Sequence, residues 1–397
     1  MCKRVIYIIV ALVLSLWGLV EASAQDAPDS TGVRLEATLV TCAPGTEAYE
    51  VYGHTALRLR RTDDARRDMV FNYGVFSFSE DNFIWRWTLG ETDYSVEMLP
   101  YGVFCRWYGE RGRAVNEQPL NLRQNELKRL ADLALADAQA AHESGWTYRY
   151  NFFYDNCTTR VIDLIERCLA PGSRIEWPQA EEQTLRQMLH QYARPINPWL
   201  CEGQDLLIGT EVDKPAPMRS QLFSPIWASH YAAQAKVVRP DGSKELLVGG
   251  EEIRWEPNDS PDRLPVVLVV ALMVLIVIAE IYLRFKRKTD WHWGVKALVH
   301  VLQGLIGIPV AILFFCSTHP AVDSNWLIVL LNPLWLIVAF LLRRGHRPGL
   351  IVSRCACALA AVGFLVGLLM GQVYPLVAYV LFLIMVVFSL RRLNEKK

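Results

Sequence analysis

The feature that most constrains this chain is the series of apolar segments in its last third. Between residues 264 and 390, long apolar stretches alternate with short polar or charged loops. A helix of about 20 apolar residues crosses the hydrocarbon core of a bilayer, and its backbone polar groups are all satisfied within the helix. We therefore predict an all-α bundle of five transmembrane helices. The expected spans are about 264–283, 295–316, 326–342, 350–370 and 373–390.

The loop charges predict the orientation of these spans. The loops at 317–325 and 371–372 contain neither Lys nor Arg. Cytoplasmic loops are enriched in both residues, so the basic loops are expected in the cytoplasm. This predicts a cytoplasmic C-terminus and an exported domain before the first span. The basic loops lie at 284–288, 343–347 and 391–397.

Several polar residues fall inside the predicted spans. Near the span ends, we expect side chains to reach the membrane interface; these residues are Glu280, Lys296, His300 and Arg354. Asn332-Pro333 lies within the third span. Because proline lacks a backbone donor, we predict a local break in that helix.

The first 24 residues have the pattern of a secretory signal peptide. Basic residues precede an apolar core, and Ala22-Ser23-Ala24 supplies a small-residue cleavage site. A retained membrane anchor is the alternative interpretation. Residues 25–262 are then an exported domain with room for one sizeable core, and residues 263–397 form the transmembrane domain.

Charge and cysteine usage give no sign of nucleic acid or metal binding. Lys and Arg number 41, as do Asp and Glu, and no basic stripe is present. The exported part holds an odd number of cysteines, which leaves a thiol free in an oxidising compartment. No spacing of Cys or His matches a zinc site, so we expect no metal and no cofactor. The sequence does not fix any pairing among Cys42, Cys105, Cys168 and Cys201.

The stretch 148–169 places a cysteine at the start of a helix. Asp155 or Asn156 is positioned to cap that helix, so Cys157 falls in its first turn. There the free N–H groups and the helix dipole favour a thiolate and can hold an oxyanion. Cys157 is therefore the candidate nucleophile, and a small core-filling cysteine is the alternative. The helical period is carried by Val161, Leu164, Ile165 and Cys168.

A histidine on a predicted strand can supply the base. His54 lies in the strand-like stretch 51–60, directly after Gly53, which lets another backbone or a substrate approach closely. A Cys with a separate His is the minimum for a thiolate–imidazole pair. The alternative is a half-buried structural histidine. The other candidates in this region are His142, His190 and His230.

A polar residue on the next strand can orient the imidazole. If the strands at 51–60 and 69–79 form a hairpin, Asn72 lies near His54 and can fix its tautomer. A strand-end asparagine without such a role is the alternative. The exported domain as a whole reads as α+β.

Other residues around Cys157 are candidates for substrate binding. Asn156, Tyr150 and Tyr154 can assist the oxyanion, although packing is the alternative for each tyrosine. Arg160 can contact a phosphate or pair with Asp163. Gly53 completes the candidate set.

The stretch 81–108 is rich in aromatic residues. One interpretation is core and strand packing. The other is an acyl-chain groove or a surface that lies on the bilayer, because Trp and Tyr favour the membrane interface.

Three motifs carry a family resemblance: TCAPGTEAYEVYGHTALRLR, FNYGVFSF and YNFFYDNCTTRVIDLI. They resemble the periplasmic domain of the Lnb-type lipoprotein N-acyltransferases of Bacteroidetes, over roughly residues 35 to 260. A strand His before an Asn-Cys helix start also resembles the circularly permuted papain-like proteins related to lecithin:retinol acyltransferase. The resemblance implies a permuted papain-like α+β domain in the periplasm, anchored in the inner membrane.

The resemblance also implies a reaction. An acyl chain passes from a phospholipid through a Cys157 thioester to the N-terminal amine of a diacylglyceryl-cysteine lipoprotein, with His54 as base. The expected partners are therefore the phospholipid donor, the lipoprotein acceptor and the membrane. The alternatives are a membrane-anchored cysteine peptidase or amidase of cell-wall peptides, and a non-catalytic binding module.

Overall fold

The computed structural model describes residues 34–79, 81–249, 264–285, 289–343 and 347–390. The predicted signal peptide lies outside these ranges. The chain divides into two compact units, which are described separately. Unit 2 combines the apolar C-terminal helices with two segments from earlier in the chain, Ile84–Glu91 and Glu182–Ala216. Unit 1 is formed by the rest of the first 256 residues.

Unit 1 is built on an antiparallel six-stranded sheet of order β5-β1-β2-β3-β4-β6. The predicted hairpin is present, since Leu57 of β2 pairs with Phe71 of β3. Residues on alternate positions face opposite sides of the sheet, so each side can carry its own apolar layer. The strands are β1 (Leu35–Cys42), β2 (His54–Arg61), β3 (Asp68–Val75), β4 (Asp93–Pro100), β5 (Val115–Pro119) and β6 (Tyr148–Arg149).

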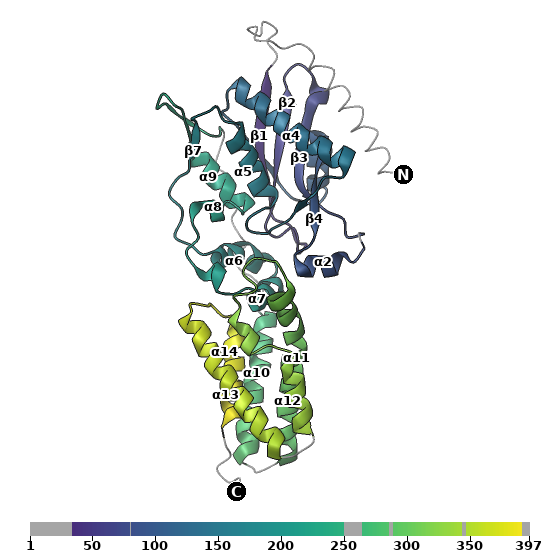
Figure 1. Cartoon of the computed structure of the whole chain (residues 1–397), viewed down its shortest axis with the longest axis vertical. Coiled ribbons are helices and arrows are strands. Elements are labelled where there is room, and N and C mark those ends of the chain that lie inside the picture. The colour runs from purple at the N-terminus through teal and green to yellow at the C-terminus, as the bar shows by residue number, and fades with distance from the viewer. Residues whose placement is uncertain (1–33, 80, 250–263, 286–288, 344–346, 391–397) are drawn as a thin grey trace. The chain divides into compact units, whose positions relative to one another are not determined.

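Two helices cover one face of this sheet, α4 (Gln124–Ser144) and α5 (Cys157–Cys168), as Figure 1 shows. The apolar face of α5 that the sequence predicts is buried there, and Ile165 is wholly inaccessible to solvent. Each helix therefore forms because its apolar face has a sheet to pack on.

The opposite face is covered by α3 (Tyr101–Gly109). Phe104 and Tyr108 pack there on Val40, Ala56 and Val70 from three neighbouring strands. Both sides of the central strands are therefore buried.

The remainder of unit 1 is a small antiparallel sheet of order β7-β8-β9 with two helices. A buried ion pair between Arg239 and Glu126 links this part to α4. Unit 1 is thus a mixed α/β domain with antiparallel sheets, as predicted. The elements of this part are β7 (Arg174–Glu176), α8 (Met218–Gln221), α9 (Pro225–Gln234), β8 (Lys236–Val238) and β9 (Lys244–Leu246). A short helix, η1 (Ala65–Arg67), lies between β2 and β3.

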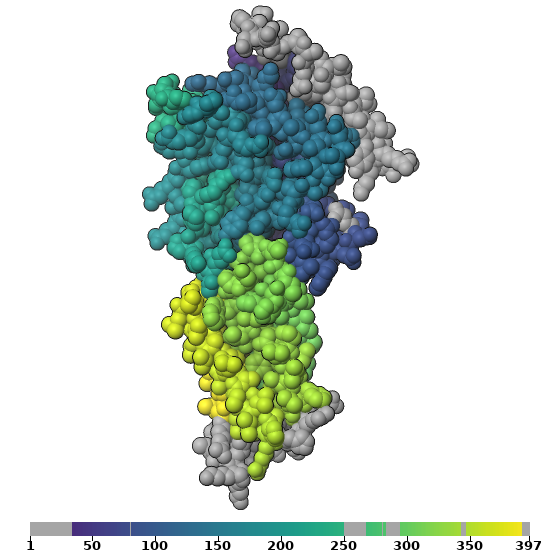
Figure 2. All heavy atoms as spheres, viewed as in Figure 1, coloured from purple at the N-terminus to yellow at the C-terminus, as the bar shows by residue number. Residues whose placement is uncertain are grey.

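Unit 2 contains the predicted helical bundle. Its helices run side by side in Figure 1 and fill a continuous column, green to yellow, in Figure 2. Among the residues described, Gly294–Cys316 and Arg347–Leu369 are long and apolar enough to cross a membrane, and three shorter apolar helices accompany them. The number of spans stays a prediction. The elements are α10 (Leu264–Phe285), α11 (Thr289–Cys316), η3 (Trp326–Val329), α12 (Leu334–Arg343), α13 (Arg347–Leu369) and α14 (Leu376–Ser389).

The polar residues of the bundle confirm one of the predictions and contradict the other. The break predicted at Asn332-Pro333 is present between η3 and α12, where the Asn332 side chain accepts from Leu334 N–H at 3.1 Å. The prediction that Lys296 and His300 reach the interface is wrong. Both are fully buried, Lys296 donating to the Phe388 carbonyl at 2.9 Å and His300 bonding Ser353 at 3.1 Å. Neighbouring helices satisfy these groups internally.

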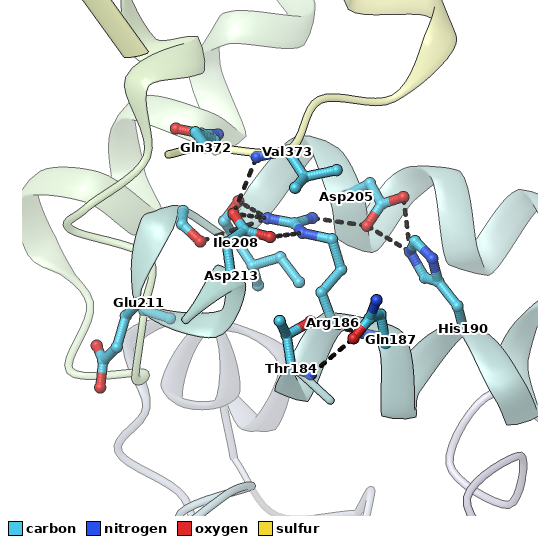
Figure 3. A network of polar contacts seen from close by, with 12 residues as sticks. Thr184, Arg186, Gln187, His190, Asp205, Ile208, Glu211, Asp213, Gln372 and Val373 are labelled. Carbon is cyan, nitrogen blue, oxygen red and sulfur yellow. Dashed lines mark hydrogen bonds and ion pairs between the residues drawn. The ribbon is translucent and has the colours of Figure 1, made fainter. Parts of the chain in front are cut away.

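A network centred on Arg186 joins the earlier segment of unit 2 to the bundle (Figure 3). Arg186 binds Asp205 at 2.6 Å and Asp213 at 2.6 Å, and Asp213 accepts from Val373 N–H at 3.1 Å. A guanidinium with two carboxylates makes strong, directional contacts. The elements concerned are α6 (Leu185–Ile196), α7 (Pro198–Leu207) and η2 (Thr210–Asp213), and α2 (Phe83–Leu89) begins the other segment.

The cysteines of the described ranges are all free. Cys42, Cys168 and Cys201 are buried, and Cys105 is half-buried. None of them is joined to another by a disulfide, so packing and polar contacts hold unit 1 together.

We expect Ile165→Ala to lower the free energy of unfolding of unit 1 by about 2–5 kcal/mol, because it opens a cavity in the layer between α5 and the sheet. Arg167→Ala, at an exposed position of the same helix, should change it by no more than about 0.5 kcal/mol. Chemical denaturation of the full chain in detergent measures both values. Equal losses would contradict the packing described.

Candidate functional site

The helix start at Cys157 is fixed by a capping arrangement. Asn156 is the N-cap, and its Oδ1 accepts from the N–H groups of Thr158 at 2.9 Å and Thr159 at 3.0 Å. The Thr159 hydroxyl in turn accepts from Asn156 N–H at 2.8 Å. The cap thus takes the second and third N–H groups of α5 and does not use that of Cys157. Of the two caps that the sequence allows, the structure selects Asn156.

The other half of the Asn156 side chain is also engaged. Its Nδ2 donates to the carbonyls of Phe152 and Phe223, both at 2.9 Å. Asn156 is buried, with 3% of its surface exposed. We therefore interpret Asn156 as the residue that positions Cys157 and not as an oxyanion donor.

The structure brings together the three residues that the sequence singles out. His54 is the first residue of β2, and its Nε2 bonds Asn72 Oδ1 on β3 at 2.5 Å. The His54 side chain also hydrogen-bonds the Cys157 side chain. Because Asn72 occupies Nε2 as an acceptor, Nδ1 is the ring atom left to serve the thiol.

The electrostatics of this pair favour its charged form. Burial by itself raises the pKa of Cys157, but the His54 charge, its hydrogen bond and the Thr55 N–H together lower that pKa below its ordinary value. Burial likewise lowers the pKa of His54, but the Cys157 charge and bonds to Cys157 and Asn72 raise it above its ordinary value. The two shifts stabilise a thiolate beside an imidazolium.

Neighbouring residues hold β2, β3 and α5 in place around the pair. The hydroxyls of Thr55 and Thr158 lie 3.0 Å apart and join β2 to α5. Gly74 has φ +92°, and a Cβ on it would lie 3.4 Å from the Cys157 Cβ. The positive φ favours glycine at this position, which lies in van der Waals contact with Cys157. The sequence signal for it was an isolated glycine inside a strand pattern.

One tyrosine hydroxyl beside the thiol has no partner. Tyr148 is buried, with 5% exposed, and its hydroxyl makes no hydrogen bond to any described residue. A hydroxyl buried without a partner is costly and needs an explanation. Burial raises the pKa of Tyr148, and the charge of the nearby Cys157 raises it further. Sequence reasoning did not single out Tyr148.

The other predicted tyrosines differ in their surroundings. Tyr150 stacks on Tyr94 with ring centroids 4.2 Å apart, and the Cys157 charge contributes, after burial, to its raised pKa. It therefore lies close to the thiol. Tyr154 is 47% exposed at the loop before α5.

Arg160 is paired, but with a partner other than the predicted one. It binds Asp155 through two bonds of 2.5 and 2.6 Å and lies over the Tyr148 ring. The pair joins Arg160, in the first turn of α5, to Asp155 just before the helix. Asp163 is therefore free to pair with Arg219.

Gly53 has the conformational role predicted for it. Its φ is +77°, and a Cβ would lie 2.8 Å from the Cys42 carbonyl oxygen. The approaching group is thus the neighbouring strand, where Cys42 pairs with His54. Glycine lets the chain enter β2 close to β1.

Two other features of the molecule lie apart from the Cys157 thiol, although Arg160 lines the first of them. A cavity of about 330 Å³ beside α4 and α5 is lined mainly by charged residues and does not include Cys157. In unit 2, ligand atoms of His190, Cys201 and Asp205 lie within 4.8 Å of one another. Arg186 already compensates Asp205, and burial raises the pKa of Cys201 to about 12, which opposes metal binding by the thiolate.

Comparison with known families matches both parts of the chain. The Lnb N-terminal periplasmic domain matches residues 29–191, and the Lnb transmembrane domain matches residues 260–397. No match was found among curated proteins or among solved structures. The molecule is therefore a membrane-associated protein with a periplasmic N-terminal part. It belongs to the Lnb family of lipoprotein-modifying enzymes.

The pKa directions predict how Cys157 reacts with an alkylating agent. Its alkylation rate should rise with pH at a lower midpoint than that of an ordinary thiol. His54→Ala should move the midpoint upward, because the lowering of the Cys157 pKa by the His54 charge and hydrogen bond is then lost. Residue-resolved mass spectrometry of the full chain measures both midpoints. Cys168, whose pKa burial raises to about 12, is the internal control. An unchanged midpoint in His54→Ala would contradict the ion pair.

Proposed function

We propose that this protein is a thiol acyltransferase that moves an acyl chain from a phospholipid to the N-terminal amine of a diacylglyceryl-cysteine lipoprotein. The observation that carries the proposal is the hydrogen-bonded Cys157–His54–Asn72 chain in the domain of an Lnb family member. Cys157 is the proposed nucleophile, His54 the acid and base, and Asn72 the residue that orients His54. The proposal needs no cofactor.

In the first step, the Cys157 thiolate attacks the ester carbonyl of the phospholipid. A C–S bond forms, the C–O bond breaks, and the His54 imidazolium gives its proton to the departing lysophospholipid oxygen. A thioester on Cys157 and a neutral imidazole remain. The raised pKa of His54 supports this step, because it keeps the proton available beside the leaving group.

In the second step, the lipoprotein amine attacks the thioester carbonyl. Neutral His54 takes the proton of the amine, a C–N bond forms, and the C–S bond breaks to release the thiolate. The Asn72 carbonyl accepts the Nε2 proton of His54, which supports the tautomer with a free Nδ1 lone pair.

Two donors are proposed for the oxyanion of each step. The Cys157 N–H lies at the start of α5, where the cap leaves it unused. The Tyr148 hydroxyl is buried beside Cys157 without a partner. Tyr150 and Tyr154 are proposed to line the substrate path, and Arg160 with Gly53 to support the walls.

The membrane domain is proposed to hold this site at the source of both substrates. Five spans, with residues 25–262 in the periplasm and the C-terminus in the cytoplasm, fit the loop charges. A phospholipid is the acyl donor available in that compartment. The order of strand His before helix Cys supports a permuted papain-like fold for the catalytic domain.

The direct test is mass spectrometry of a lipoprotein N-terminal peptide from cells that carry the intact protein, Cys157→Ser or Cys168→Ser. Cys157→Ser should lower N-acylation by about 10⁴-fold or more, because it removes the nucleophile. Cys168→Ser, at the buried far end of the same helix, should retain it.

Unchanged N-termini in all three strains would overturn the proposal. If cell-wall peptides changed instead with Cys157→Ser, the cysteine hydrolase would be the better account. If no product depended on Cys157, the site would not be catalytic.

Tyr148→Phe tests the oxyanion assignment. It removes the hydroxyl and keeps the ring, so turnover should fall by about 10²–10³-fold. Thermal unfolding should show no loss of stability, because the hydroxyl has no partner to lose. Turnover equal to that of the intact protein would exclude Tyr148 as a donor.

A further inference from the structure

The aromatic-rich stretch 81–108 divides into two groups. Four of its rings are buried in unit 1 and account for core packing: Phe83, Tyr94, Phe104 and Tyr108. The residues of α2 that follow Phe83 belong to unit 2, and three large apolar side chains among them are exposed. Ile84 is 68% exposed, Trp85 54% and Trp87 50%. Large apolar side chains gathered on one short helix mark an interaction surface.

The end of α2 is held by the loop that follows α11. Thr318 N–H donates to the Leu89 carbonyl at 2.9 Å, and the Thr318 hydroxyl donates to the Gly90 carbonyl at 3.2 Å. The His319 ring donates from Nε2 to the Trp87 carbonyl at 2.6 Å and packs edge-on against the Trp87 ring. These contacts all lie within unit 2.

The fit between the two segments depends on a glycine. Gly90 has φ +73°, and a Cβ on it would lie 2.6 Å from the Thr318 hydroxyl and 3.0 Å from His319 N. Both the backbone conformation and the close approach therefore favour glycine at this position. The contact between α2 and the loop is thus a specific arrangement.

The loop ties the end of α2 to the end of a candidate membrane span. Cys316 ends the helix Gly294–Cys316, which is long and apolar enough to cross a bilayer and lies in the matched transmembrane domain. Thr318 follows two residues later, a distance of at most about 7 Å along the chain. In a bilayer crossed by this helix, the end of α2 would lie near the level where the hydrocarbon core meets the head groups.

We propose that Ile84, Trp85 and Trp87 form an anchor that inserts into the interfacial region of the phospholipid bilayer, on the side where α11 ends. Trp prefers this region because its ring is apolar and its N–H can bond head groups. The only charged residue of α2 is Arg86, and α2 has no acidic residue to repel lipid phosphates. The inference rests on the transmembrane assignment and is independent of the acyl-transfer proposal.

Photo-crosslinking tests the occupant of this surface. The full chain, with p-benzoylphenylalanine in place of Trp85, is reconstituted in vesicles of phosphatidylethanolamine and phosphatidylglycerol and irradiated. We expect a phospholipid adduct at position 85. The control places the same group at Glu143, an exposed position of α4 in unit 1, where we expect no lipid adduct.

Three results would overturn the proposal: equal lipid adducts at both positions, no lipid adduct at position 85, or an adduct at twice the chain mass, which would make a second copy the occupant.

A second variant tests the role of the loop. Gly90→Ala should separate α2 from Thr318 and abolish the lipid adduct at position 85. Gly145→Ala is the matched control, because Gly145 also has positive φ, +65°, but has open space around its Cβ. It should leave the adduct unchanged. Retention of the adduct in Gly90→Ala, or its loss in both variants, would contradict the proposed arrangement.

Discussion

The Asn156 cap is the interaction on which the site depends. One side-chain oxygen takes the Thr158 and Thr159 N–H groups, and one amide nitrogen holds the carbonyls of Phe152 and Phe223. The start of α5 is therefore fixed to one residue. A shift of one residue would rotate Cys157 by about 100° around the helix, away from His54. The hydrogen bond between Cys157 and His54, the N–H that the cap leaves unused and the close approach of Gly74 all follow from that fixed start.

Much of the site could be predicted because its determinants are local in sequence. The period of α5, the capping residues and the alternation of β2 are each readable from short stretches, and they predicted the places of Cys157, His54 and Asn72. Tyr148 and the partner of Arg160 could not be predicted in this way. Both depend on where the chain before α5 returns to the sheet, and that path is set by tertiary packing.

The same distinction applies to the second unit. Apolar runs and the Asn332-Pro333 break predicted helices and an interruption, but the burial of Lys296 and His300 depends on neighbours from other helices. Sequence composition gave no sign that residues 84–91 and 182–216 pack with the bundle, whose loops their hydrogen bonds join. A segment can thus be distant in sequence from the unit in which it packs.

The most direct test of the catalytic account is to trap the acyl-enzyme. The full chain is incubated with a phospholipid that carries an isotopically labelled acyl chain, without an acceptor, and the peptide that contains Cys157 is weighed. The account predicts a labelled acyl group on Cys157 that hydroxylamine removes and that an added diacylglyceryl-cysteine peptide takes up as an amide. Formation of the labelled amide with no acyl group ever detected on Cys157 would contradict it.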